Sequence, residues 1–297
     1  MARRQKQAVT VREAAGEAGA DARRPLVAYI KGILGSLKPA ERLIAERVLA
    51  DPERVVSSPI GEIKRLSGAS VGSIIGFCRR LGLKGFTDFK LALARDLAQA
   101  GLSAAETPEN GSLFEKVFHF HGQSLLETVR VNSPATFEHV ALALGKARRI
   151  ELFSIGLSYP VAYTAYCKLL LLGLPASAQA DPHMQLITAT QMRAGDLAFG
   201  ISCSGTTRET VQCMEVAKGN GATAICLTNA MKSPITAQSN HCLYATPSEI
   251  KYFQAPLASR ITQLAVIDAL FVSLALKNKH KIAARLQRSR EELLKRR

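Results

Sequence analysis

A cluster of hydroxyl residues follows an apolar stretch in the second half of the chain. Residues 196–201 are mostly apolar, and Ser202-Cys203-Ser204-Gly205-Thr206-Thr207 comes directly after them. A strand that turns here into a helix presents hydroxyl and backbone N–H groups at the helix N-terminus, where the helix dipole favours an anion. Gly205 permits a tight turn. Because the Gly-Lys-Ser/Thr of a nucleotide phosphate loop is missing, the cluster predicts a site for a small phosphate ester, and we expect a sugar phosphate.

Three segments together resemble the sugar isomerase (SIS) domain, whose five-stranded parallel sheet binds phosphosugars. They are Phe153-Ser154-Ile155-Gly156-Leu157-Ser158, residues 202–209 and the apolar segment 222–228. The resemblance implies that Ser158, Ser202, Ser204 and Thr207 hold the phosphate, around the turn at Gly205. Ser154, Leu157 and Cys203 depart from the family pattern, and these changes bear on the sugar more than on the phosphate. Hydroxyl residues after a strand also cap helices, so that alternative stays open.

The composition is that of a globular chain long enough for two domains, with 297 residues of which 47% are hydrophobic. The N-terminus shows no secretory signal, and the apolar run 264–276 contains Asp268 and is too short to cross a bilayer. Six cysteines without a Cys-x-x-Cys pair indicate reduced thiols. We therefore expect a cytoplasmic protein with no membrane segment, no metal site and no cofactor.

The net charge of +15 is concentrated at the two ends of the chain. Residues 1–100 hold 18 Lys/Arg against 10 Asp/Glu, residues 101–276 hold 12 against 12, and residues 277–297 hold 9 against 2. The excess charge therefore lies away from the expected phosphate site and indicates a polyanionic partner, most naturally DNA. A basic end can also be a solvated tail, which we expect for residues 1–25.

The N-terminal part has the pattern of a helix-turn-helix. A helix after Pro39 closes at Asp51-Pro52, Ser58-Pro59 opens the next, and the turn Gly68-Ala69-Ser70 leads into a third that ends at Gly82. Ile74, Phe77, Cys78 and Leu81 form the expected buried stripe of the third helix, which would read DNA. An ordinary three-helix domain with a basic face is the alternative.

A second resemblance joins the two halves of the chain. Residues 39–45, 70–82 and Lys84-Gly85-Phe86-Thr87-Asp88-Phe89-Lys90 resemble the N-terminal domain of RpiR-family bacterial transcriptional regulators, a family that couples this domain to a SIS domain. The family commonly has Arg where this chain has Gly76, and a glycine weakens a helix by about 1 kcal/mol relative to Ala. The expected DNA contacts are therefore Ser70, Ser73, Arg79, Arg80 and Lys84.

The expected fold class is an all-α helix-turn-helix domain followed by an α/β SIS domain with a five-stranded parallel sheet flanked by helices. We expect a tail at residues 1–25, the helix-turn-helix domain at 26–97, a linker at 98–112, the SIS domain at 113–280 and a basic helical extension at 281–297. Expected strands lie near 149–155, 175–180, 196–202, 222–228 and 241–245. Ligands bind such sheets at the carboxyl ends of the strands, where Ser158 and Ser202 fall.

The combined patterns predict a DNA-binding regulator of carbohydrate metabolism that senses a phosphorylated sugar and is not an enzyme. We expect a homodimer or homotetramer, since paired readers double the DNA contacts. A sugar-phosphate isomerase with an accessory helical domain is the alternative. It needs a general base, for which His183, Glu209 and Glu249 are the candidates. A sugar-binding scaffold without DNA recognition is a third possibility. Asp181 of Asp181-Pro182-His183 is expected to cap a helix.

Overall fold

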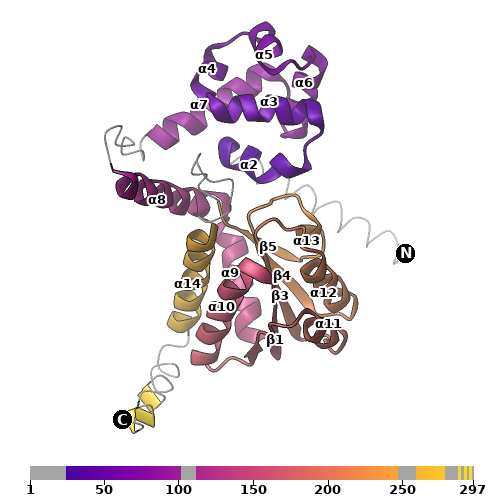
Figure 1. The fold of residues 1–297 in the computed structure, drawn as a ribbon, viewed down its shortest axis with the longest axis vertical. Helices are drawn as coiled ribbons and strands as arrows, with labels where there is room; N and C mark the ends of the chain where they lie inside the picture. The colour runs from indigo at the N-terminus through magenta and orange to yellow at the C-terminus, as the bar shows by residue number, and fades with distance from the viewer. Residues whose placement is uncertain are drawn as a thin grey trace, which may run out of the picture. The chain divides into compact units, whose positions relative to one another are not determined.

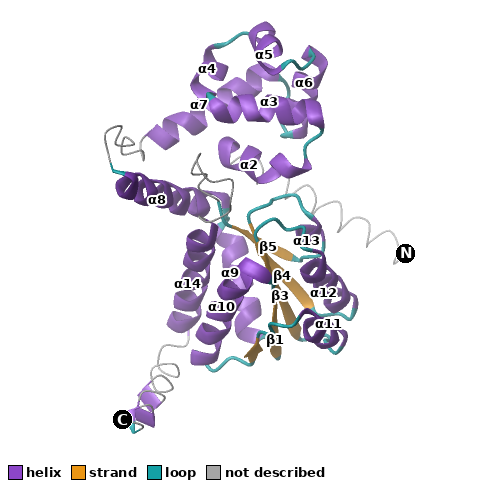
Figure 2. Ribbon diagram, viewed as in Figure 1, coloured by secondary structure: helices purple, strands orange, loops and turns teal. Residues whose placement is uncertain are grey.

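The computed structural model describes residues 25–101, 112–246 and 259–277, and residues 287, 288, 291, 292, 294 and 295 near the C-terminus. The chain divides into two compact units, Met1–Thr107 and Pro108–Arg297. Their helices and strands are drawn in Figures 1 and 2. The expected tail, but for Pro25, and residues 102–111 of the expected linker lie outside the described residues.

The first unit consists of helices in its described part. They are α2 (Leu26–Ile33), the short 3-10 helix η2 (Leu34–Ser36), α3 (Pro39–Ala50), α4 (Pro52–Ser57), α5 (Ile60–Ser67), α6 (Val71–Arg80) and α7 (Phe86–Gly101). Their core is apolar: Phe77 and Phe89 are fully buried and meet edge to face, with ring centroids 6.1 Å apart. The expected stripe of α6 is confirmed, because Ile74, Phe77, Cys78 and Leu81 are all buried.

Two details of this unit differ from the expectation. Helix α4 lies where only a helix boundary was expected: the Asp51 carboxylate accepts a hydrogen bond from the Arg54 N–H at 3.1 Å, and Pro52 occupies the first turn. Asp51-Pro52 thus ends one helix and begins another. Helix α7 continues to Gly101, four residues into the expected linker, since residues 97–100 are helix formers and one terminal glycine costs little.

The second unit is a parallel sheet between two helical layers. Its helices are α8 (Leu113–Val131), α9 (Pro134–Lys146), the short 3-10 helix η3 (Gly156–Ser158), α10 (Tyr159–Leu171), α11 (Pro182–Thr190), α12 (Arg208–Gly219), α13 (Pro234–Ala237) and α14 (Ser259–Lys277). Its strands are β1 (Arg149–Phe153), β2 (Ala176–Ser177), β3 (Asp196–Ser202), β4 (Thr223–Thr228) and β5 (His241–Tyr244). The expected fold class is confirmed: the sheet has five strands in the order β2-β1-β3-β4-β5, all parallel.

Buried apolar side chains attach helices to both faces of the sheet. Helices α9, α10 and α14 share one apolar core with it, and α11, α12 and α13 share another on the opposite face (Figure 1). All seven residues of β3 are buried, which explains the apolar run between Asp196 and Ser202. Gly200 of β3 is needed for this packing, because a Cβ there would lie 2.8 Å from the Met214 sulfur.

Five residues near the C-terminus are helical. Gln287, Arg288, Glu291, Glu292 and Leu294 of the expected extension are helical and exposed. The six cysteines are free thiols. Within the described ranges, no helix is long and apolar enough to cross a membrane, and no cluster of His, Cys, Asp or Glu could hold a metal.

Candidate functional site

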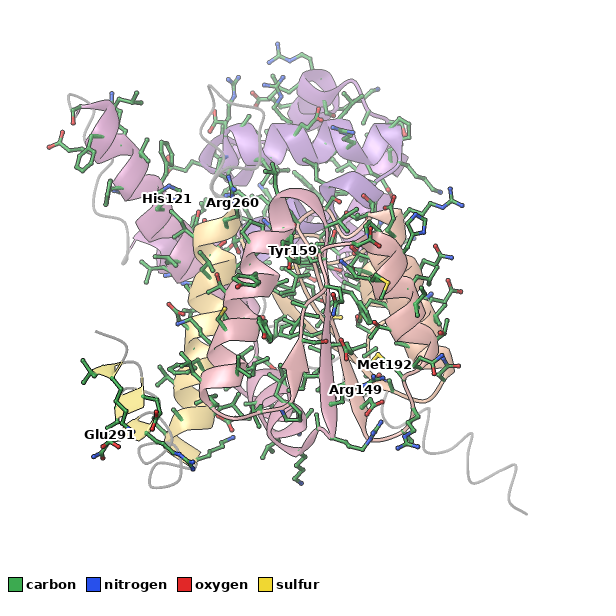
Figure 3. The ribbon with its side chains drawn as sticks, turned by 60° about the horizontal axis from the view of Figure 1, so that its bottom comes forward. His121, Arg149, Tyr159, Met192, Arg260 and Glu291 are labelled. Atoms are coloured by element: carbon green, nitrogen blue, oxygen red, sulfur yellow. The ribbon has the colours of Figure 1, made fainter. Side chains whose placement is uncertain are left out.

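The strand order places the two hydroxyl-bearing loops side by side. β1 pairs with β2 on one side and with β3 on the other, so the chain leaves β1 and β3 toward opposite faces of the sheet. Ligands of open α/β sheets bind at such a switch point, outside the carboxyl ends of the strands. In Figure 3, Tyr159 and Arg260, which lie in the first turns of α10 and α14, mark this end of the sheet, whereas Arg149 and Met192 mark the other.

The loop after β3 is closed by its own hydroxyl groups. The Ser202 side chain is 2% exposed, and its oxygen lies 3.0 Å from the Thr207 hydroxyl oxygen and accepts a hydrogen bond from the Gly205 N–H at 3.1 Å. Ser204 is exposed and accepts from the Thr206 N–H and hydroxyl. The structure thus brings Ser202, Ser204, Gly205 and Thr207 into one turn.

Gly205 is held in a conformation that favours glycine. Its φ is +66°, and an added Cβ would come within 2.3 Å of the Ser233 hydroxyl oxygen. Its carbonyl oxygen accepts from the Ile235 N–H at 3.0 Å, and Ile235 is fully buried. The turn is therefore fixed against α13 as well as by its own side chains.

The N-terminus of α12 is left without a side-chain cap. Thr207 precedes α12 in an extended conformation, and its hydroxyl accepts no hydrogen bond from the first turn of that helix. Ser158 differs, because it is the last residue of η3, which continues directly into α10, and the Tyr159 N–H already donates to the Gly156 carbonyl. Hydroxyl residues that serve only as caps would make such bonds. The N–H groups of α12 and the hydroxyls beside them are therefore available to an anion, without a charged side chain in residues 202–207.

Ser158 and Ser154 have different places in the loop after β1. Ser158 is half-buried at the start of α10, after Gly156, whose φ is +58°. Ser154 is fully buried, and its hydroxyl donates to the Ile201 carbonyl at 2.8 Å. The Gln185 side chain bonds both the N–H and the carbonyl oxygen of Ser154. Ser154 therefore joins the loop after β1 to β3, while the phosphate contact of Ser158 stays a prediction.

The structure describes two of the three residues considered for isomerase chemistry. Asp181 caps α11 by accepting from the Met184 N–H at 2.9 Å, as expected. His183 and Glu209 are exposed, and Glu249 lies outside the described residues.

A third loop, after β4, belongs to the same edge and was not expected from the sequence. The Asn229 N–H and the Thr228 hydroxyl both donate to the Cys203 carbonyl, at 3.1 and 3.3 Å. The sequence offered a signal, because Thr228 ends the apolar segment 222–228 just as Ser202 ends the segment 196–202, and the structure pairs the two residues in register. Gln263 of α14, which bonds the Asn229 side chain at 3.0 Å, is too distant in sequence to have been found this way.

In the first unit, α5, its turn and α6 form the predicted helix-turn-helix. Gly68 ends α5 with a φ of +70°, and the Ser70 hydroxyl caps α6 by accepting from the Ser73 N–H at 3.1 Å. The Ser70 and Ser73 hydroxyls also bond each other, at 2.9 Å. Both therefore lie at the start of the helix.

A basic groove lies at the other end of α6. Its volume is about 520 Å³, and Arg79, Lys84 and Lys90 contribute cations to a lining that includes Ile75 and Phe86. Arg79 and Lys84 are exposed. The Lys90 ammonium donates to the Ser58 carbonyl at 3.3 Å and so is partly committed within the unit.

Arg80, the second arginine expected to contact DNA, is bonded within the first unit. Its guanidinium pairs with Glu41 at 2.9 Å and donates to the Ser36 carbonyl at 2.7 Å. Its side chain is 28% exposed. The expected pair of DNA-contacting arginines is thus separated: Arg79 points outward, whereas Arg80 links α6 to α3 and η2.

Comparisons with known proteins agree with this two-part organisation. Residues 25–100 match the family described as a helix-turn-helix domain of the rpiR family, and residues 143–273 match the SIS domain. An uncharacterized HTH-type transcriptional regulator from Caldanaerobacter subterraneus is 34% identical over 272 residues, which cover 90% of this chain and 96% of that protein. The HTH-type transcriptional regulator HexR of Pseudomonas aeruginosa is 32% identical over 273 residues, 91% of this chain and 95% of HexR.

Two further proteins are similar to this chain, one over part of its own length and one in fold. The bifunctional protein glk of Paraburkholderia xenovorans is 32% identical over 255 residues, which cover 84% of this chain but only 39% of that protein. NanR of Vibrio vulnificus, solved complexed with ManNAc-6P, has a TM-score of 0.58 at 24% identity, covering 92% of this chain and 99% of NanR, and it shares the fold. The chain belongs to the rpiR family of HTH-type transcriptional regulators and couples its helix-turn-helix domain to a SIS domain.

Proposed function

We propose that this regulator senses a phosphorylated sugar at the carboxyl ends of β1 and β3 and controls genes of carbohydrate metabolism. The observation that carries the proposal is the uncapped N-terminus of α12 at Thr207, beside the hydroxyls of Ser202 and Ser204. Hydroxyl groups that cap no helix, next to N–H groups that no side chain satisfies, suit a phosphate dianion. The phosphate contacts proposed are Ser158, Ser202, Ser204, the Gly205 turn and Thr207.

The ligand class follows from the chemistry of the loop. The loop at residues 202–207 contains no lysine and no pair of acidic residues that could hold magnesium. A phosphate monoester therefore fits this loop better than a nucleoside triphosphate does. The complex of NanR with ManNAc-6P supports the same class at the level of the fold.

The proposed DNA contacts are Ser70, Ser73, Arg79 and Lys84. The first two lie at the N-terminus of α6, and the last two lie on the basic groove at its other end. The groove combines cations with apolar side chains, which suits a backbone of phosphates and deoxyriboses. Arg80 is proposed to hold α6 in position through Glu41 rather than to bind DNA.

The regulator is proposed to act as a homodimer or homotetramer. A two-fold arrangement fixes the spacing of two DNA half-sites, and an effector that binds one arrangement better shifts the population toward it. The ligand is proposed to be bound without being converted, because no described acid or base is buried beside the phosphate loop.

The test combines three measurements on the full chain. Hexose and hexosamine phosphates are screened for thermal stabilisation against their unphosphorylated parents, since a ligand at 100 times its Kd stabilises by about 2.7 kcal/mol. The binding phosphosugar is then incubated with the protein to detect conversion, and DNA from near the gene is used in a gel shift. Stabilisation by a phosphosugar with a specific shift and no turnover is expected. Turnover at enzymatic rates without a DNA shift would establish the isomerase instead.

A further inference from the structure

Two amide side chains meet at the carboxyl edge of the sheet, one half-buried and one fully buried, from elements far apart in sequence. Asn229 follows β4, and Gln263 lies in α14 and is 0% exposed. The Gln263 Nε2 donates to the Asn229 Oδ1 at 3.0 Å. The second turn of α14 is thereby joined to the end of β4.

Each amide keeps one buried polar atom that has no hydrogen-bond partner among the described residues. These atoms are the Asn229 Nδ2 and the Gln263 Oε1. If both amides were rotated by 180°, the pair would still be bonded once, and one N–H group and one oxygen would again be unpaired. A buried amide pair that served packing alone would be improved by apolar side chains of the same shape. The unpaired donor and acceptor therefore need another explanation.

The pair is attached to the phosphate loop. The Asn229 N–H donates to the Cys203 carbonyl at 3.1 Å, and the Thr228 hydroxyl donates to the same oxygen. Gln263 lies three residues beyond Arg260, about 4.5 Å along the helix, and Arg260 marks the carboxyl end of the sheet in Figure 3. The amides thus stand beside the loop that contains Ser202, Ser204 and Thr207.

We propose that the unpaired N–H group and oxygen of the Asn229–Gln263 pair bind hydroxyl groups of the sugar whose phosphate occupies the 202–207 loop. A sugar hydroxyl both donates and accepts, so a fixed donor beside a fixed acceptor complements one hydroxyl or two adjacent ones. A site built to bond hydroxyls rejects ligands that lack them, because its own polar groups then stay unpaired. This inference rests on the proposed function and names the feature that separates sugar phosphates from other phosphate esters.

The experiment replaces the amides by apolar side chains of similar shape. Asn229→Leu, Gln263→Met and the double variant are compared with the unaltered full chain, and Gln191→Met is the matched control, since Gln191 is exposed at the C-terminal end of α11. The probes are glucose 6-phosphate, fructose 6-phosphate and ManNAc-6P, with n-butyl phosphate and orthophosphate as anions that carry no sugar hydroxyl. Calorimetry gives the affinities, and urea unfolding without ligand gives the stability.

The expected result separates sugar binding from phosphate binding. Affinity for whichever sugar phosphate binds best should fall by about 10-fold or more in the double variant. Affinity for n-butyl phosphate and orthophosphate should stay within about twofold, and the unfolding midpoint should stay the same or rise. The Gln191→Met control should match the unaltered chain throughout.

Three results would overturn the assignment. Unchanged sugar-phosphate affinity in the double variant would show that the amides do not bind the sugar hydroxyl groups. A lowered unfolding midpoint in both single variants, with equal losses for every anion, would make the pair a structural link. Binding of no sugar phosphate by the unaltered chain would remove the proposed function, and this inference with it.

Discussion

Gly205 lies so close to Ser233 that a Cβ at position 205 would come within 2.3 Å of the Ser233 hydroxyl oxygen. Ser233 cannot simply move away, because its hydroxyl donates to the Ala230 carbonyl at 3.1 Å and its backbone N–H donates to Thr236 at the start of α13. The turn after β3 and the start of α13 are therefore packed as one piece.

Gly205→Ala should abolish this arrangement. The positive φ and the contact with Ser233 together should cost about 1–3 kcal/mol of stability, and the displaced turn should lose phosphosugar binding. Gly195→Ala is the control: its φ is +88°, but the nearest heavy atom to its Cβ is 4.0 Å away and it lies before β3, at the opposite edge. Urea unfolding and calorimetry should show a larger loss at 205, with binding retained at 195. Equal effects would mean that only the φ matters.

Ser202→Ala should weaken phosphosugar binding by about 10- to 150-fold, or roughly 1.5–3 kcal/mol, the value of a hydrogen bond to a charged group. The reason is the position of the buried Ser202 hydroxyl between the Gly205 N–H and Thr207. Ser239→Ala, which removes a hydroxyl bonded to the Ile235 carbonyl, should leave affinity unchanged. Calorimetry with the phosphosugar and its unphosphorylated parent tests this. If wild type binds both equally, the phosphate assignment is wrong.

The parts of the fold that depend on local signals could be predicted from the sequence. Strands β1, β3 and β4 could be predicted because their buried residues form apolar runs, and α6 because Ser70 and Gly82 mark its ends. The expected strand near 175–180 is only the two half-buried residues of β2. The hydroxyl loop could be predicted because all of its residues lie within the short segment 202–207. Helix α4 was missed for a local reason, since Asp51-Pro52 both ends and begins a helix.

Contacts between distant parts of the chain could not be predicted in this way. Arg80 bonds Glu41 and Ser36, which lie 39 and 44 residues earlier in the chain, and no spacing rule relates them to Arg80. The bond between Asn229 and Gln263 spans 34 residues and forms only when α14 packs on the sheet. By residue type alone, Arg79 and Arg80 are equal candidates for DNA contacts. The tertiary structure distinguishes them, because Arg79 is exposed and Arg80 is bonded within the unit.

Gly76→Ala should stabilise the first unit by about 1 kcal/mol, because alanine is the better helix former and no heavy atom lies within 4 Å of the added Cβ. Gly76 is exposed on α6, so Gly76→Arg, the residue common in the family, should also fold and either tighten DNA binding or change the preferred sequence. Urea unfolding and a DNA selection experiment measure the two effects. Gly68→Ala should instead destabilise, since its φ is +70°. Loss of stability in Gly76→Ala would contradict the packing seen around this position.

Arg79→Ala and Arg80→Ala, although adjacent, should have opposite consequences. Arg79 is exposed on the basic groove, so Arg79→Ala should leave the free energy of unfolding within about 0.5 kcal/mol of wild type. If Arg79 contacts a DNA phosphate, its loss should also reduce the slope of log affinity against log salt concentration by about 0.9. Arg80→Ala breaks the bonds to Glu41 and the Ser36 carbonyl and should destabilise by about 1.5–3 kcal/mol.

Urea unfolding and DNA titrations at several salt concentrations, with a specific and a random fragment, distinguish these outcomes. A base contact by Arg79 would instead cost about 1–3 kcal/mol on the specific fragment only. Arg80→Ala should weaken DNA binding only by unfolding part of the protein, so its loss of affinity should shrink at a temperature where the variant is fully folded. If Arg79→Ala keeps the wild-type affinity and slope on every DNA, and Arg80→Ala does so when folded, α6 is not the reading element. The basic stretch at residues 277–297, with 9 Lys/Arg against 2 Asp/Glu, would then be the better candidate.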